Sequence, residues 1–148
     1  IIIVSSSPQV RYPDYYGIDM SSLGQFIAFH AAIRLLQETG RNSVIEETYR
    51  ECLRQRELPD SERINCVKTI YAPFTDKEIS ERIARLLVEE SKKPPRAQVE
   101  ILYQTLEGMH KAIPDHPGDW YFSGDYPTPG GNRLVNEAYI DFYEKYLR

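Results

Sequence analysis

The hydrophobic and polar positions of the chain predict strands and helices in alternation. Ile1 to Val4 are four apolar β-branched residues followed by a Ser-Ser-Ser-Pro break. This pattern is typical of a strand buried on both faces of a parallel sheet. Ser22 to Thr39 carry apolar side chains at helical spacing, and Gly40 follows as a stop signal. We therefore expect a strand and then a helix.

The middle of the chain predicts two further helices around a second strand. Asn65 to Phe74 has β-branched and aromatic residues at strand density. Charged side chains four positions apart in the later helix, such as Glu78 and Arg82, predict a solvated face. Each helix start is indicated by a capping box, in which a Ser or Thr precedes a Glu by three positions. These pairs are Ser43 with Glu46 and Thr75 with Glu78.

The last third is more ambiguous. Val99 to Ile113 fits either one helix or a strand, Val99 to Tyr103, that runs into a helix from Thr105 to Ile113. Pro114 to Gly131 is too rich in proline and glycine for a long regular element. Asn132 is expected to cap a terminal helix.

Composition narrows the class of protein. The 148 residues include 41% hydrophobic ones, which is enough for a single core and hence one region. With 18 basic and 22 acidic side chains and a net charge of -4, the chain has no cationic surface for nucleic acid or an anionic membrane. No apolar run approaches a membrane span and no leader opens the chain. We expect a cytoplasmic protein whose natural chain extends upstream of Ile1, because the sequence starts inside a strand.

Few residues suggest chemistry by themselves. Cys52 and Cys66 are expected to be reduced and buried. The histidines are His30, His110 and His116, and none lies within four residues of another His or a Cys, so no local metal-ligand cluster is indicated. Ser5 to Ser7 follow a predicted strand, where open α/β sheets bind ligands, and either bind a phosphate or form a plain loop. From the residues alone, the chain is an α/β piece with a candidate ligand loop from Ser5 to Asp19.

Two motifs extend this interpretation. The stretch VSSSPQVRYPDYYGIDM resembles the amidophosphoribosyltransferase family, in which a strand and a small-residue-Pro loop precede Arg, an aromatic residue, Pro and Tyr-Gly-Ile-Asp-Met. A second stretch, FSGDYPT, is similar to the Phe-x-Gly-x-Tyr-Pro-Thr motif that precedes the C-terminal helix of that family. The matching positions of the first motif are Pro8, Arg11, Tyr12, Pro13, Tyr16, Gly17, Ile18, Asp19 and Met20.

The resemblance implies the C-terminal portion of a type I phosphoribosyltransferase-like domain, with few parallel strands, several helices and a C-terminal helix. It would carry a helix-rich insertion at about 27–74 and a tail at 114–148. The full enzyme transfers ammonia from glutamine to phosphoribosyl diphosphate with Mg²⁺, which opens purine biosynthesis. The nucleophilic Cys and the paired-acid Gly-Thr-Thr loop of the family are not in this sequence. We therefore expect this piece to be inactive alone and to hold no catalytic residue or metal ligand.

The resemblance also implies a wall of the nucleotide or phosphoribosyl pocket. Its expected residues are Ser6, Pro8, Arg11, Tyr16 and Asp19. The alternative is that this turn only packs aromatic rings over the sheet edge.

The chain departs from the family at two places. Ser21 stands where the family usually has Pro, which puts a nucleotide contact there in doubt. Gly118 and Tyr121 stand where some members have two iron–sulfur cysteines, so no cluster is expected. Anchoring of the tail would then fall to aromatic packing. The rings available are Trp120, Tyr121, Phe122 and Tyr126.

Partners follow from the same resemblance. They would be the upstream glutaminase and phosphoribosyltransferase regions of the same chain, with purine nucleotides as inhibitors and a homo-oligomeric full-length enzyme. The competing interpretation is a non-enzymatic regulatory or assembly module that is built on the same fold segment.

Overall fold

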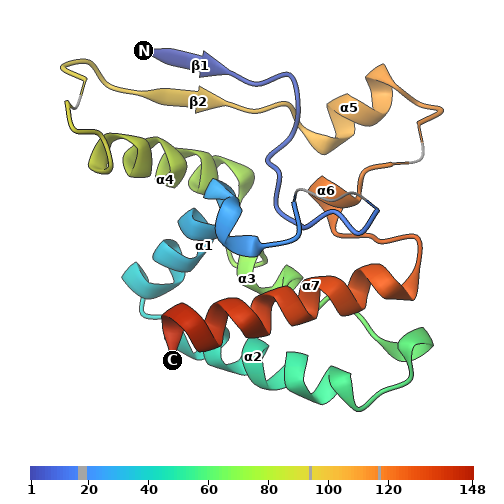
Figure 1. The fold of residues 1–148 in the computed structure, drawn as a ribbon. Helices are drawn as coiled ribbons and strands as arrows, with labels where there is room; N and C mark the ends of the chain where they lie inside the picture. Colours follow the sequence, from blue (N-terminus) through green and yellow to red (C-terminus); the bar gives the residue numbers. More distant parts are fainter. Residues whose placement is uncertain (17–19, 94, 117) are drawn as a thin grey trace.

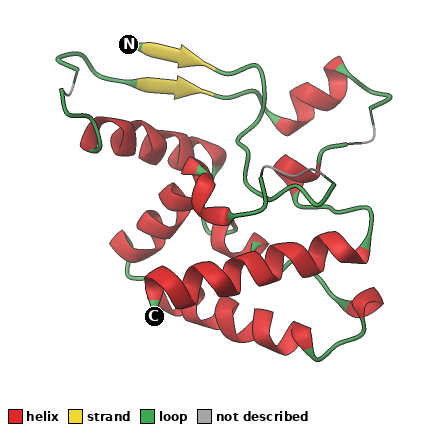
Figure 2. Cartoon of the chain, viewed as in Figure 1, coloured by secondary structure: helices red, strands yellow, loops and turns green. Residues whose placement is uncertain are grey.

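A computed structural model describes residues 1–16, 20–93, 95–116 and 118–148. It is a mostly helical fold with a two-stranded parallel sheet and a C-terminal helix (Figures 1 and 2). The strands are β1 (Ile2–Val4) and β2 (Glu100–Leu102). The helices are α1 (Ile27–Glu38), α2 (Asn42–Arg56), α3 (Lys68–Tyr71), α4 (Asp76–Glu89), α5 (Leu106–Ala112), α6 (Trp120–Ser123) and α7 (Pro129–Phe142). Two short 3-10 helices are η1 (Leu23–Gln25) and η2 (Asp60–Glu62), and a π-helical segment, η3 (Tyr143–Leu147), continues α7.

The sheet is parallel, as predicted, and pairs Ile3 with Ile101. Helix α4 packs against β2, and Ile101 is buried. Strand β1 is exposed instead of buried on both faces, with Ile2 at 65% and Val4 at 73%. The burial prediction is wrong for this chain because α4 covers β2, whereas no described helix packs comparably against β1.

The hydrophobic core lies in the helical body below the sheet in Figure 1. Helix α1 packs between α4 and the lower helices, and α2 packs against α7. The region 27–74 thus supplies three of the helices that enclose the core. Fully buried side chains of the core include Phe29, Leu36 and Ile70 from this region, and Ile83, Val135 and Tyr139 from α4 and α7.

The first two helices are confirmed with changed starts. The Ser22–Thr39 segment forms η1 and then α1, and Gly40 follows with φ +71°. Helix α2 has Arg41 as its N-cap without a side-chain cap, so the predicted capping box at Ser43 is wrong. The cause is the tight turn at Gly40, where the Arg41 N–H donates to the Leu36 carbonyl at 2.7 Å and the next helix begins at once.

The predicted start of α4 is confirmed, but the prediction that its charged side chains form a solvated face is wrong for Arg82. The Thr75 hydroxyl accepts the Glu78 N–H, and the Glu78 carboxylate accepts the Thr75 N–H. Arg82 does not lie on a solvated face. It is 3% exposed and pairs with Glu38 of α1 and with Glu89. The guanidinium therefore joins α1 to α4.

The strand predicted over Asn65–Phe74 is wrong, since α3 occupies its centre. Its buried apolar residues recur at helical intervals, which the β-branched composition obscured. These residues are Cys66, Val67, Ile70 and Tyr71.

In the last third, the strand-then-helix alternative is confirmed by β2 and α5. The prediction of an Asn132 cap is wrong, because α7 begins at Pro129 with Thr128 as its N-cap. Proline fits the first helical turn, where its missing N–H has no partner to lose. The Asn132 amide instead donates to the Arg63 carbonyl at 2.9 Å. Among the described helices, none has the length and apolar composition to cross a membrane.

Candidate functional site

The candidate ligand loop, of which the structure describes residues 5–16, leaves the carboxyl end of β1. The Ser5 N–H donates to the Leu102 carbonyl at 2.8 Å and so continues the sheet by one residue. The Ser5 hydroxyl then closes a local turn, donating to the Ser7 carbonyl at 3.0 Å. Ser6 is exposed between them. The loop therefore starts as an ordered turn with one outward hydroxyl.

A buried polar network ties the loop to the start of α4. The Arg11 guanidinium donates to Gln9 Oε1 at 2.7 Å and to Asp76 Oδ1 at 2.6 Å. The Gln9 amide donates in turn to the Asp76 carbonyl at 2.8 Å and to Ser80 Oγ at 2.7 Å. Gln9 is 3% exposed, so its own bonds are shielded from water, whereas the Arg11–Asp76 pair lies at the surface with the Asp76 side chain 68% exposed.

A second anchor is the segment that carries the other motif. We call residues 121–128 the docking segment. Its Tyr121 carbonyl accepts the backbone N–H groups of Arg11 at 2.9 Å and of Tyr12 at 3.1 Å. The Tyr16 hydroxyl lies 2.8 Å from Thr128 Oγ1. The two motifs, about a hundred residues apart in sequence, thus form one packed unit.

Close packing at Gly124 keeps the docking segment on the loop. Gly124 has φ +72°, and a Cβ added there would lie 2.6 Å from Asn65 Nδ2 and 2.8 Å from Tyr12 Cζ. Only glycine combines this backbone conformation with so close an approach.

Three tyrosines under the loop are structural. Tyr12 and Tyr71 meet edge to face at 5.4 Å, and the Tyr71 hydroxyl donates to the Arg11 carbonyl at 2.8 Å. Burial is the main cause that raises the pKa of Tyr12, of Tyr71 and of Tyr126. Their hydroxyls therefore stay protonated, and those of Tyr71 and Tyr126 donate to the carbonyls of Arg11 and Pro13.

The predicted pocket residues differ in how far their side chains are exposed. Pro8 is buried, and the Arg11 side chain is 16% exposed and engaged by Gln9 and Asp76. Ser6 and Tyr16 are exposed, Tyr16 at 50%. Asp19 lies outside the described residues. Of this set, Ser6 and Tyr16 present side chains that a ligand can reach.

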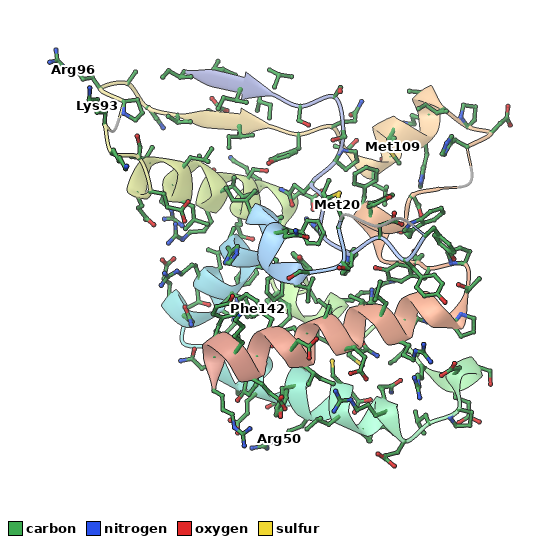
Figure 3. All side chains as sticks on the ribbon, viewed as in Figure 1. Met20, Arg50, Lys93, Arg96, Met109 and Phe142 are labelled. Atoms are coloured by element: carbon green, nitrogen blue, oxygen red, sulfur yellow. The ribbon has the colours of Figure 1, made fainter. Side chains whose placement is uncertain are left out.

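A groove of about 1120 Å³ lies between α4 and β2. Gln9 and Ser80 line it, together with apolar residues such as Val88 and Ile101. Arg96 also lines it and lies with Lys93 at the turn between α4 and β2, far from Met20 and Met109 (Figure 3). Sequence reasoning missed this groove because its residues come from three separate segments.

The aromatic anchor of the tail is only partly enclosed. Trp120, Tyr121 and Phe122 are half-buried, and Trp120 meets Tyr16 edge to face at 5.1 Å. The Trp120 Nε1–H is buried without a partner in the described part of the chain. Beside it, His110 Nε2 lies 2.9 Å from Asp119 Oδ2, which joins α5 to the start of α6.

Cys52 and Cys66 are free and buried, as predicted. Within the residues that the structure describes, no three side chains of His, Cys, Asp or Glu are grouped as metal ligands. No family model, curated protein or solved structure matches the chain.

Proposed function

We propose that this chain is the C-terminal part of an amidophosphoribosyltransferase, covering the end of its phosphoribosyltransferase domain and the tail. The observation that carries the proposal is the direct contact of the two motifs, in which the Tyr126 hydroxyl donates to the Pro13 carbonyl at 2.5 Å and the Tyr16 hydroxyl lies 2.8 Å from Thr128 Oγ1. Both motifs were selected by resemblance alone, and their direct contact supports a shared origin in one structural unit.

The exposed sheet supports the same proposal. Ile2, Ile3 and Val4 are 43–73% exposed in a strand without polar residues on either face. Strands with this composition are normally covered on both faces. Further strands and helices from upstream regions of the chain would cover β1 in the proposed parent.

In this proposal the loop forms one wall of the nucleotide pocket. Ser6 and Tyr16 are the side chains that reach a ligand, and Arg11 is a positioning residue held by Gln9 and Asp76. A loop fixed at both ends loses little freedom when a ligand binds, which favours affinity and orientation. Mg²⁺, held by residues outside the described part, would assist the departure of pyrophosphate in the parent. The parent would be cytoplasmic and homo-oligomeric, with purine nucleotides as inhibitors.

Complementation tests the proposal. We expect the chain alone neither to release ammonia from glutamine nor to consume phosphoribosyl diphosphate. Mixing it with the separately produced upstream region should restore pyrophosphate release from phosphoribosyl diphosphate, ammonia and Mg²⁺. Turnover by a clean preparation of the chain alone would contradict the proposal, as would full activity of the upstream region without it. The latter result would favour a regulatory or assembly module.

A further inference from the structure

The two cysteines, fourteen positions apart in sequence, meet at one buried side chain of α7. Asn136 Oδ1 accepts the backbone N–H of Cys66 at 3.0 Å and lies 3.8 Å from Cys52 Sγ. Cys52 is fully buried in α2, and Cys66 is 3% exposed just before α3. Tertiary packing thus brings the Cys52 thiol next to the backbone of Cys66, whose own thiol lies 3.7 Å from the Ile64 carbonyl.

The thiols also act on each other. A hydrogen bond with Cys66 is the largest cause that raises the pKa of Cys52, followed by burial. The same contact lowers the pKa of Cys66. Cys66 is therefore the thiol that more readily becomes a thiolate, with Cys52 as the proton donor beside it.

The segment around Cys66 offers a route for a reagent. It has no regular helix between Arg56 and Lys68 except the short turn η2. Side chains hold it in place, among them the Asn136 amide, which donates to the Ile64 carbonyl at 2.8 Å. Irregular segments open locally at a lower free-energy cost than helix interiors, so Cys66 becomes accessible before Cys52.

We propose that Cys52 and Cys66 form a dithiol couple that a small-molecule disulfide converts into an intramolecular disulfide in the native chain. With oxidised glutathione, the Cys66 thiolate attacks one sulfur, and one glutathione thiolate leaves. Cys52 then loses its proton, and its thiolate attacks the Cys66 sulfur and displaces the second glutathione. Two protein thiols are oxidised and one glutathione disulfide is reduced to two thiols. The product links α2 covalently to the segment before α3.

The experiment treats the folded 148-residue chain with oxidised glutathione and follows free thiols, intact mass and far-ultraviolet circular dichroism. We expect free thiols to fall from two per chain to none. The product should be a monomer lighter by two hydrogens, with a Cys52–Cys66 linked peptide and an unchanged spectrum. Thiols that stay free in the native chain but oxidise in urea would overturn the proposal. So would dimers, or glutathione retained at both cysteines.

Two variants test the assigned order of attack. In Cys52→Ser the resolving thiol is absent, so a glutathione adduct should persist on Cys66. In Cys66→Ser, Cys52 should react at least tenfold more slowly than Cys66 does in the first variant. Equal rates, or faster reaction of Cys52, would overturn the assignment of Cys66 as the attacking thiol. The wild-type measurement stands even if a variant fails to fold.

Discussion

The hydroxyl of Tyr126 donates a hydrogen bond of 2.5 Å to the carbonyl of Pro13, across 113 positions of sequence. Pro13 is buried, so loss of this donor leaves a carbonyl without compensation from water. We expect Tyr126→Phe to lower the free energy of unfolding by about 1–3 kcal/mol, measured by urea denaturation. Tyr146, which is 61% exposed, gives the matched control Tyr146→Phe. Equal effects of the two substitutions would contradict the importance of this bond.

Two glycines separate backbone strain from close packing. Gly40 and Gly124 have φ of +71° and +72°, but an added Cβ meets nothing within 4 Å at Gly40. Gly40→Ala should cost about 1–2 kcal/mol from the left-handed backbone alone. Gly124→Ala should cost about 1–3 kcal/mol more, because Tyr12 and Asn65 must move. Thermal or urea unfolding measures both losses of unfolding free energy. Similar losses for the two variants would mean that the docking segment shifts to accommodate the added Cβ.

Trp120 provides a test of aromatic anchoring in the tail. Its ring is half-buried, so Trp120→Ala should destabilise the chain by about 2–4 kcal/mol, near the lower end of values for large aromatic truncations. Trp120→Phe should cost less than half as much, because it also removes a buried N–H without a partner in the described residues. Urea denaturation measures both. A phenylalanine variant as unstable as the alanine variant would show that the indole N–H is satisfied.

If aromatic packing anchors the tail, the protein needs no iron–sulfur cluster there. With Gly118 and Tyr121 at the positions of the family's cluster ligands, anaerobically purified protein should be colourless. Iron and sulfide analysis checks this, and stoichiometric amounts of both would contradict it.

The role of Arg11 can be separated from a direct ligand contact in the proposed full-length enzyme. The Gln9 side chain accepts a hydrogen bond from the Arg11 guanidinium. If Arg11 acts by holding the loop, Arg11→Ala and Gln9→Ala should therefore weaken nucleotide binding to a similar extent. Glutaminase activity should be unchanged in both. Nucleotide titration gives the affinities. A loss confined to Arg11→Ala would indicate that the guanidinium itself meets the nucleotide.

Acid should weaken one contact between α2 and α7. A hydrogen bond from Arg56 holds the pKa of Glu137 below its usual value, with Arg56 Nε to Glu137 Oε1 at 2.8 Å. Because the pKa of Glu137 is lower in the folded than in the unfolded state, its ionised form stabilises the fold at pH values above the unfolded-state pKa of about 4.3. This stabilisation is lost as the pH falls through the folded-state pKa. Glu137→Gln should therefore destabilise at pH 7, and this effect should shrink as the pH falls below the unfolded-state value. Both side chains are more than one-third exposed, so the effect should stay below about 1 kcal/mol and shrink in salt.

Local signals predicted those elements whose cause is local. The Thr75 and Glu78 pair located the start of α4 because a capping box involves residues three apart. The strand predicted around Ile70 failed because composition was given more weight than periodicity. The loop and its docking segment were found as motifs, but the Gln9 and Asp76 network was not. Its partners come from distant segments, and only the fold brings them together.

The register of the sheet also sets an order of events during synthesis. Ile2 pairs with Glu100, so β1 cannot pair with β2, its neighbour among the described strands, until nearly a hundred further residues have been made. At about 5–20 residues per second, that interval is roughly 5–20 s. The helices from α1 to α4 are complete before β2 exists. We therefore expect the helical body to form first on the ribosome. During that time the Ile-Ile-Ile-Val segment is not paired with β2, and chaperones that bind extended apolar segments can bind it.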